Sequence, residues 1–287
     1  MNANASIPSR NTFPLGRIAV VTGCSGAIGR ATARALADRR WNVVGTTRVK
    51  NIGTTVPETN LLVQALDAEA VVRGDEWALP LLPVRSAVWG AVPPVALLVN
   101  NAAVCPAEWD AAAVQTALDV NVRLAARLAD AYMFHGARDA MHPGAVVNIS
   151  SGDGELCFFV EPWRSRIAAL DTMAQLERLM HEVVQRVRDG TLPADAVVHG
   201  PEPAYRLSKA LLNRLTVLQA RRAPRQVRVD AVCPGDVRSA MTSYGGSRTA
   251  EEAAADIVHL VELQLASWRG ETTPSGQLWR YRQPTTF

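Results

Sequence analysis

The sequence predicts an α/β fold in which a parallel sheet is covered by helices on both faces. Two observations support this prediction. Short apolar runs recur along the chain, as in strands that are buried on both faces, and helical patterns lie between most of them. The chain has 287 residues, of which 48% are hydrophobic, and is therefore long enough to bury one large core. We expect a single domain over residues 17–287.

The apolar runs predict six strands, each ending near a glycine, a polar residue or a charge. These strands cover residues 17–23, 41–48, 61–67, 95–101, 144–150 and 227–235. A helix is predicted directly after the first strand, over residues 26–39. Another is predicted over residues 84–90, between segments that contain prolines and therefore interrupt helices.

Residues 152–203 separate the fifth strand from a helix predicted at 204–215, and we interpret them as a helical insertion within the domain. Apolar residues recur at helical spacing over residues 163–188, which predicts one amphipathic helix. This helix could bind a partner, but packing against its own domain is the favoured interpretation. Three aromatic residues near its start could line an apolar substrate pocket or anchor the insertion: Phe158, Phe159 and Trp163.

Composition argues against several classes of function. The formal net charge is only +3 and the arginines are spread along the chain, so we expect no nucleic-acid partner. No apolar run reaches 18 residues, so no transmembrane helix or membrane partner is predicted. Residues 1–16 lack the apolar core of a secretory signal and are interpreted as a disordered leader, with a weak targeting role left open. The four cysteines have no metal-binding spacing and suit a cytoplasmic protein without a metal.

A glycine-rich turn, TGCSGAIG at residues 22–29, connects the first strand to the following helix. In this setting backbone N–H groups and a helix N-terminus can bind a phosphate, although a simple tight turn is the alternative. The second strand ends at Arg48. An acidic residue there would bind a ribose 2′-hydroxyl, whereas an arginine can bind the 2′-phosphate of NADP. Arg48 therefore favours NADP over NAD, unless it is simply exposed to solvent.

A second motif lies in AYRLSKALLNRL, residues 204–215, whose leucines recur at helical spacing. Tyr205 and Lys209 are four residues apart, so their side chains share one face of the helix. A cation at this distance favours the ionised form of a tyrosine and would lower its pKa from about 10. The pair is therefore suited to general acid–base catalysis. The alternative is a tyrosine that packs over a lysine stem on a solvated face.

In chain order, these motifs resemble those of the short-chain dehydrogenase/reductase family, from residue 17 to about residue 281. The glycine-rich turn resembles T-G-x-x-x-G-x-G, and NNAA at residues 100–103 resembles N-N-A-G. NISS at residues 148–151 ends at the position of the catalytic serine. CPGDVRSAM at residues 233–241 resembles the segment that borders the nicotinamide. The resemblance implies a Rossmann-type doubly wound parallel sheet.

The resemblance also implies a set of site residues. The catalytic residues would be Asn121, Ser151, Tyr205 and Lys209. The residues that would bind NADP(H) are Gly23, Ser25, Gly26, Ile28, Gly29, Arg48, Asp67, Asn100, Ala102, Tyr205, Lys209, Pro234, Gly235 and Val237. Tyr205 would be the general acid/base, and Lys209 would also hold the nicotinamide ribose. Ser151, preferred to Ser150, would bind the substrate oxygen. Asn121 would hold a water molecule, unless it only bonds nearby backbone.

The long insertion resembles that of the monomeric carbonyl reductases, which implies a monomer that reduces a carbonyl or quinone substrate with NADPH. An NAD(H)-dependent alcohol dehydrogenase and a non-catalytic NADP-binding sensor are the alternatives. Three positions depart from the pattern. Ala27 replaces the second glycine of the turn, Ala103 replaces the glycine of N-N-A-G, and Gly26 stands where carbonyl reductases tend to have a basic residue. The Cβ of Ala27 would lie where the backbone should approach the pyrophosphate.

Overall fold

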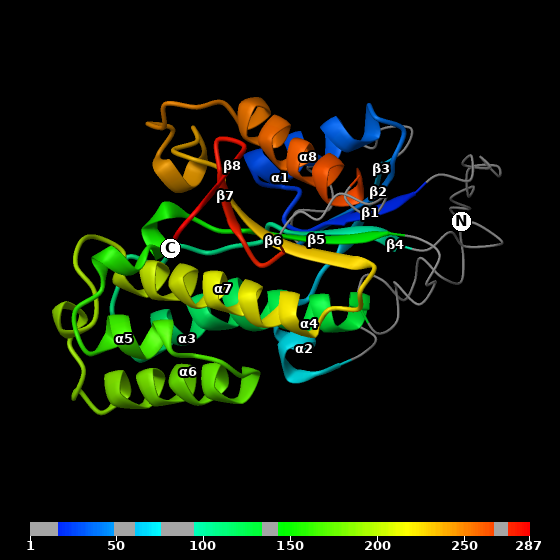
Figure 1. The fold of residues 1–287 in the computed structure, drawn as a ribbon. Coiled ribbons are helices and arrows are strands. Elements are labelled where there is room, and N and C mark those ends of the chain that lie inside the picture. The colour runs from blue at the N-terminus through cyan, green and yellow to red at the C-terminus, as the bar shows by residue number, and fades with distance from the viewer. Residues whose placement is uncertain (1–16, 49–60, 76–94, 134–142, 267–274) are drawn as a thin grey trace, which may run out of the picture.

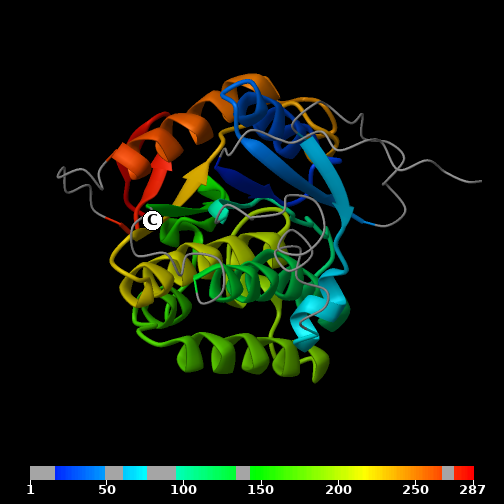
Figure 2. The ribbon, with the colours of Figure 1, turned by 90° about the vertical axis from the view of Figure 1, so that its right-hand side faces the viewer.

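The computed structural model of the chain describes residues 17–48, 61–75, 95–133, 143–266 and 275–287. The predicted leader at 1–16 and the predicted helix at 84–90 lie outside the described residues. Within them, a central sheet has helices packed on both faces (Figures 1 and 2). The predicted fold class, a doubly wound and mostly parallel sheet in a single domain, is confirmed.

The sheet has eight strands in the order β3-β2-β1-β4-β5-β6-β7-β8. All neighbouring strands are parallel except β7 and β8, which are antiparallel. The strand bounds are β1 Ile18–Val21, β2 Asn42–Thr47, β3 Leu61–Ala65, β4 Val95–Asn100, β5 Gly144–Ile149, β6 Val227–Cys233, β7 Leu278–Arg280 and β8 Gln283–Thr285. All six predicted strands are present, and the central ones are buried throughout, as their continuous apolar runs predict.

The sequence does not predict β7 and β8, because each has only three residues and neither is a continuous apolar run. Contacts with distant residues hold β7 in place. The carboxylate of Asp230 in β6 accepts hydrogen bonds from the backbone N–H of Gln277 and from the side chain of Gln264, both at 2.8 Å. The start of β7 is thereby tied to β6 and to α8 (Ala250–Ala266), the helix that carries Gln264.

Two helices, α1 (Ala27–Ala37) and α8 (Ala250–Ala266), cover one face of the sheet. The opposite face is covered by α2 (Ala68–Arg73), α4 (Leu124–Ala131) and α7 (Pro203–Arg222), with α3 (Ala111–Leu118) leading into α4 (Figure 1). Each face has its own apolar core, and a third core lies farther out, between α7 and the insertion.

The insertion contains two helices, α5 (Trp163–Ala168) and α6 (Met173–Arg188), so the prediction of one helix over 163–188 is wrong. The reason is local. The backbone of Thr172 is extended, its hydroxyl accepts from the N–H of Gln175, and the Gln175 side chain accepts from the N–H of Thr172. This capping box starts a new helix. The apolar spacing continues across the break because both helices bury residues in the same core.

The outer helix α6 packs on its own domain, as favoured from the sequence. Its residues Leu176, Met180 and Val183 are buried in the same core as Leu207 and Leu211 of α7. Figure 2 shows α6 as an additional layer outside the helices that touch the sheet. The insertion thus supports α7 from the side that faces away from the sheet.

The 3₁₀ turn Gly152–Gly154, just after β5, packs directly against the backbone of α7. A Cβ added to Gly154 would lie 2.5 Å from the backbone carbon of Lys209 and 2.7 Å from the backbone nitrogen of Ala210. Real Cβ atoms do not approach backbone atoms so closely, so the glycine permits this contact. It places the end of β5 beside the residues of α7 that carry the predicted chemistry.

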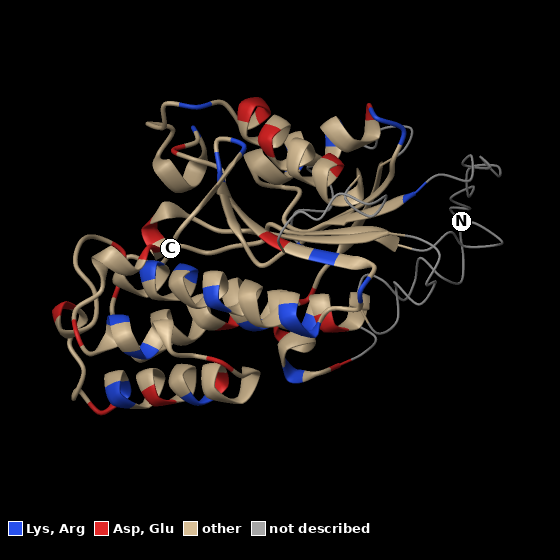
Figure 3. Cartoon of the chain, viewed as in Figure 1, with Lys and Arg blue, Asp and Glu red and all other residues tan. Residues whose placement is uncertain are grey.

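Acidic and basic residues are distributed over many elements, and α6 carries both (Figure 3). Several arginines form surface ion pairs, including Arg39 with Glu262 and Arg221 with Asp171. No helix among the described residues is long and apolar enough to cross a membrane.

We expect Gly154→Ala to lower the free energy of unfolding by about 1–3 kcal/mol, because the added methyl group would push α7 away from the end of β5. Urea or thermal unfolding would measure the loss. Gly245→Ala is the matched control, since its Cβ would meet only the carbonyl oxygen of Thr242 at 3.4 Å. Equal stability of Gly154→Ala and the parent chain would contradict the close contact.

Candidate active site

The carboxyl ends of the parallel strands surround a cavity of about 1210 Å³. It lies where the strand order reverses between β1 and β4, which is where doubly wound folds bind ligands. Most of the predicted site residues line it: Gly23, Ser25, Gly26, Ile28, Gly29, Arg48, Ala102, Ser151, Tyr205, Lys209, Pro234, Gly235 and Val237.

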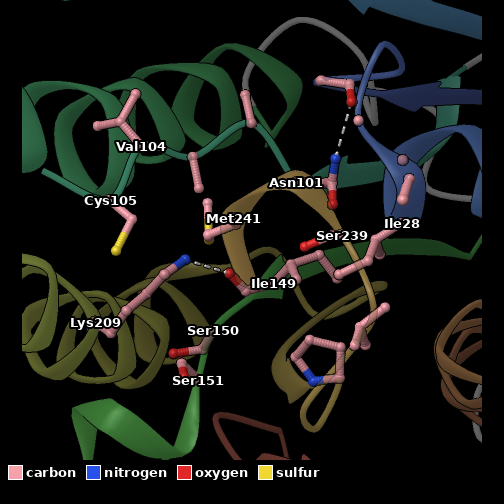
Figure 4. Close-up of a pocket in the computed structure, with 18 of the residues that line it drawn as sticks. Ile28, Asn101, Val104, Cys105, Ile149, Ser150, Ser151, Lys209, Ser239 and Met241 are labelled. Atoms are coloured by element: carbon pink, nitrogen blue, oxygen red, sulfur yellow. Dashed lines mark hydrogen bonds between the residues drawn. The ribbon is translucent and has the colours of Figure 1, made fainter. Parts of the chain in front are cut away.

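Two predicted cofactor residues do not line the cavity. Asp67 is the N-cap of α2, where its carboxylate accepts from the N–H of Ala70 at 3.0 Å. Asn100 is buried and donates to Asn148 Oδ1 at 2.9 Å, which ties β4 to β5. Its neighbour Asn101 lines the cavity instead and donates from Nδ2 to the carbonyl of Thr22 at 2.8 Å. Figure 4 shows its longer bond, of 3.3 Å, to the carbonyl of Gly23. Asn101 is the second asparagine of the NNAA motif, so the motif itself contains the residue that lines the cavity.

Asn121 lies in a π-helical turn, Asp119–Arg123, and is buried. Its Nδ2 donates to the carbonyl of Val104 at 2.9 Å and to Ser208 Oγ at 2.8 Å, while its Oδ1 accepts from the N–H of Val104 at 2.9 Å. Both amide hydrogens are therefore engaged. The side chain therefore holds the loop after β4 against α7. Val104, whose backbone it bonds, is 17 residues away in the chain and lies outside the helix that carries Asn121.

The glycine-rich turn forms one wall of the cavity and packs closely against the residues that follow β4. Gly23 has a φ of 71°, and a Cβ there would lie 2.9 Å from the Cα of Ala102. A Cβ at Gly29 would lie 2.5 Å from Asn101 Nδ2. The N-terminus of α1 has no side-chain cap and no acidic residue in its first turn, so it can bind an anion.

The departure at Ala27 fits this backbone. Ala27 is the first residue of α1 and has no positive φ, so its Cβ introduces no strain, and it lines the cavity. At the end of β2, the Oγ1 of Thr47 is buried beside the cavity without a hydrogen-bond partner among the described residues. The residues present thus fit a dinucleotide that passes over the turn and reaches Thr47.

Tyr205 and Lys209 both line the cavity, with Lys209 Nζ 5.5 Å from the centroid of the Tyr205 ring. Lys209 is 2% exposed, and its ammonium donates to the carbonyl of Ile149 at 2.8 Å (Figure 4). Burial lowers the pKa of Lys209 to about 8.

The pKa of Tyr205 differs from the sequence-based expectation. Burial raises it well above 10, and the negative charge of Asp153 adds to the increase, whereas the hydroxyl of Ser151 acts in the opposite direction. Desolvation disfavours the phenolate more than its neighbours favour it. In this form of the protein Tyr205 therefore holds its proton near neutral pH.

The two serines after β5 have different surroundings. Ser150 is 2% exposed, and its hydroxyl donates to Asn213 Oδ1 at 2.5 Å, away from Tyr205. Ser151 is partly exposed in the cavity, interacts with Tyr205, and donates to Asp153 Oδ2 at 3.0 Å. Both serines line the cavity, and of the two only Ser151 is partly exposed in it.

The three aromatic residues of the insertion divide between the two roles left open by the sequence. Phe158 lines the cavity, whereas Phe159 and Trp163 are buried in the outer core and anchor the insertion. Cys105 also lines the cavity, and burial followed by the charge of Glu202 raises its pKa to about 11, which keeps it a thiol.

Sequence reasoning missed several residues around the cavity. Arg30, in the first turn of α1, also lines it. Arg280 reaches it from β7 and forms an ion pair with Glu155. The mouth carries the largest exposed apolar and aromatic side chains of the described residues: Met241, Tyr244 and Tyr281. Met241 is the last residue of the CPGDVRSAM segment, whereas Tyr244 and Tyr281 lie outside the motifs and are revealed only by their position in the fold. No cluster of three potential metal ligands occurs among the described residues.

Comparisons with known proteins place this geometry in a family. The sequence model of the short chain dehydrogenase family matches residues 17–162. A (+)-neomenthol dehydrogenase from Arabidopsis thaliana is 26% identical over 299 residues, which cover 94% of this chain and 98% of that protein.

Solved structures show the same fold. Salutaridine reductase from Papaver somniferum superposes with a TM-score of 0.76 at 22% identity, covering 92% of this chain and 99% of that one. A short chain dehydrogenase from Burkholderia cenocepacia, solved in complex with NADP, has a TM-score of 0.59 at 20% identity, covering 94% and 97%. Because the family model matches half of the chain, the chain belongs to the short-chain dehydrogenase/reductase family and is an oxidoreductase.

Proposed function

We propose that the protein reduces a small-molecule carbonyl or quinone with NADPH, and that Tyr205 donates the proton. The observation that carries this proposal is the convergence of Ser151, Tyr205 and Lys209 on one cavity beside the glycine-rich turn. The relative named a neomenthol dehydrogenase and the structural neighbour named a salutaridine reductase support an oxidoreductase that acts on a small molecule.

The cofactor would lie across the carboxyl ends of β1, β4 and β6. The turn Gly23–Gly29 would hold the pyrophosphate through backbone N–H groups and the N-terminus of α1. Lys209 would hold the nicotinamide ribose, and Pro234, Gly235 and Val237 would border the nicotinamide. When bound, NADPH supplies the hydride.

The protein's own residues supply the proton and the charge stabilisation. Reduction of a ketone leaves an alkoxide, which must receive a proton. The raised pKa of Tyr205 keeps its hydroxyl protonated, as a proton donor requires. Ser151 would donate a hydrogen bond to the substrate oxygen after releasing Asp153, and would thereby stabilise the developing negative charge. A protonated Lys209 would favour the phenolate left behind.

Two arginines support NADP rather than NAD. Arg48 follows β2, Arg30 lies in the first turn of α1, and both line the cavity. Neither forms an ion pair with another described residue. Two exposed guanidinium groups at this edge suit the 2′-phosphate that distinguishes NADP from NAD. The structural neighbour solved with NADP is consistent with this choice.

The monomeric state and the cytoplasmic location remain predictions from the sequence. The insertion packs on the outer side of α7 and α3. The resemblance to the monomeric carbonyl reductases implies that it lies near the surface that other family members use for dimerisation. Size-exclusion chromatography with light scattering would report the oligomeric state directly.

Tyr205→Phe should lower kcat/KM for carbonyl reduction by about 10²–10⁴-fold, because it removes the proton donor and leaves the ring in place. NADPH oxidation with a panel of quinones, aldehydes and ketones would measure this effect. Binding of NADPH, followed by its fluorescence, should remain within a few-fold of the parent chain. Turnover that survives the substitution would contradict the role of Tyr205. Binding of NADPH without turnover in the parent chain would instead support a sensor.

Arg48→Ala and Arg30→Ala should each weaken NADPH binding by about 10–100-fold, the effect expected when a charge-assisted hydrogen bond to a phosphate is removed. Affinity for NADH should hardly change. The matched control is Arg178→Ala, which removes the same charge from an exposed position on α6. Equal losses for NADPH and NADH would mean that neither arginine reads the 2′-phosphate.

A further inference from the structure

A buried arginine lies directly beside the proposed proton donor. Arg206, the residue after Tyr205, is 9% exposed. Its Nε donates to the carbonyl of Pro201 at 2.9 Å, and its guanidinium lies over the ring of Phe158, 4.4 Å from the centroid. A Cβ at Gly200 would lie 3.2 Å from the guanidinium carbon, so the glycine leaves room for it. Arg206 is thus held in one place from several sides.

The guanidinium of Arg206 is paired with Asp153, whose Oδ1 lies 2.8 Å from a terminal nitrogen. The other carboxylate oxygen of Asp153 accepts from Ser151 Oγ at 3.0 Å. The backbone N–H of Asp153 also donates to Ser151 Oγ, at 3.2 Å. A chain of polar contacts therefore runs from buried Arg206 through Asp153 to the serine that faces Tyr205.

We propose that Arg206 and Asp153 are positioning residues that orient the hydroxyl of Ser151 and set the proton affinity of Tyr205 through their opposite charges. The proposal rests on the proposed function, because it concerns the same proton donor. Asp153 fixes where the Ser151 proton points, and Arg206 both anchors the carboxylate and offsets its charge. Neither residue needs to touch the substrate for this role.

The charges around Tyr205 determine the sign of each effect. The groups that act on it are Asp153 and Ser151 after β5, Cys105 after β4, Cys233 at the end of β6, and Lys209 on its own helix. Asp153 favours the protonated phenol, and its 41% exposed side chain keeps this effect moderate. Removing the carboxylate should therefore lower the pKa of Tyr205. Removing the arginine leaves the carboxylate uncompensated and should raise it.

The test compares variants at the two ends of the pair. Tyr205 must be protonated to donate, so reduction should fall as pH rises through its pKa. Asp153→Asn should move this alkaline limb of kcat/KM to lower pH by several tenths to about one unit, and Arg206→Gln should move it to higher pH. Arg206→Lys, which retains the cation, should return the limb toward its position in the parent chain.

A second readout needs no substrate. The ultraviolet absorbance of tyrosinate, taken as the difference between each variant and the same variant carrying Tyr205→Phe, reports the ionisation of Tyr205 with NADP⁺ bound. The midpoint of this absorbance titration should shift in each variant in the same direction as the alkaline limb of kcat/KM. If the titration shifts as expected but no carbonyl compound is reduced, the pair sets the pKa of Tyr205 and the proposed function fails by itself.

Glu161→Gln serves as the charge control, because it removes one carboxylate from an exposed position outside the cavity. It should leave the titration of Tyr205 unchanged. If the pair had only a structural role, Asp153→Asn and Arg206→Gln would both lower the stability of the protein, and they would not shift the pKa of Tyr205 in opposite directions. Shifts in the same direction, or no shift in the Asp153→Asn variant, would overturn the proposal. Because Asp153 is partly exposed, the Asp153→Asn variant should fold even if the Arg206→Gln variant does not.

Discussion

The contact between the end of β5 and the first half of α7 is the constraint on which the site depends. A lysine that is 2% exposed needs a partner for its charge, and the carbonyl of Ile149 supplies one at 2.8 Å. The glycine at 154 lets the turn after β5 lie against the backbone of α7. These contacts join residues about sixty positions apart and bring Ser151 next to Tyr205. The insertion between them packs on the outer side of α7 and leaves the cavity open.

Much of this arrangement can be predicted from the sequence, for physical reasons that differ between elements. Central strands buried on both faces must be continuous apolar runs, so β1, β4 and β5 are visible in the sequence. The three-residue strand β7 is held by contacts with distant residues, including Asp230, and has no such signal. The break before α6 is encoded by Thr172 and Gln175, but the uninterrupted apolar spacing around it conceals the signal.

The same distinction holds within the site. The spacing of Tyr205 and Lys209 predicts their shared face, because helix geometry is local. The pKa of Tyr205 depends on how completely the loop after β4, the end of β5 and the end of β6 surround the hydroxyl, and spacing along one helix does not contain that information. Asn100 and Asn101 are adjacent in the sequence, yet Asn100 ends β4 and bonds Asn148 and the carbonyl of Ala125 in α4, whereas Asn101 lies beyond the strand and lines the cavity.

The ion pair between Arg280 and Glu155 joins the seventh strand to the turn after the fifth. Arg280 also fills the space that a side chain at Gly152 would need. This wall of the cavity is therefore completed by a part of the chain that is synthesised after the glycine-rich turn and α7. The glycine-rich turn, Ser151, Tyr205 and Lys209 all precede it and can come together once α7 packs on β5. During synthesis, the groups proposed to bind the nucleotide and to donate the proton can assemble before this wall of the cavity is complete.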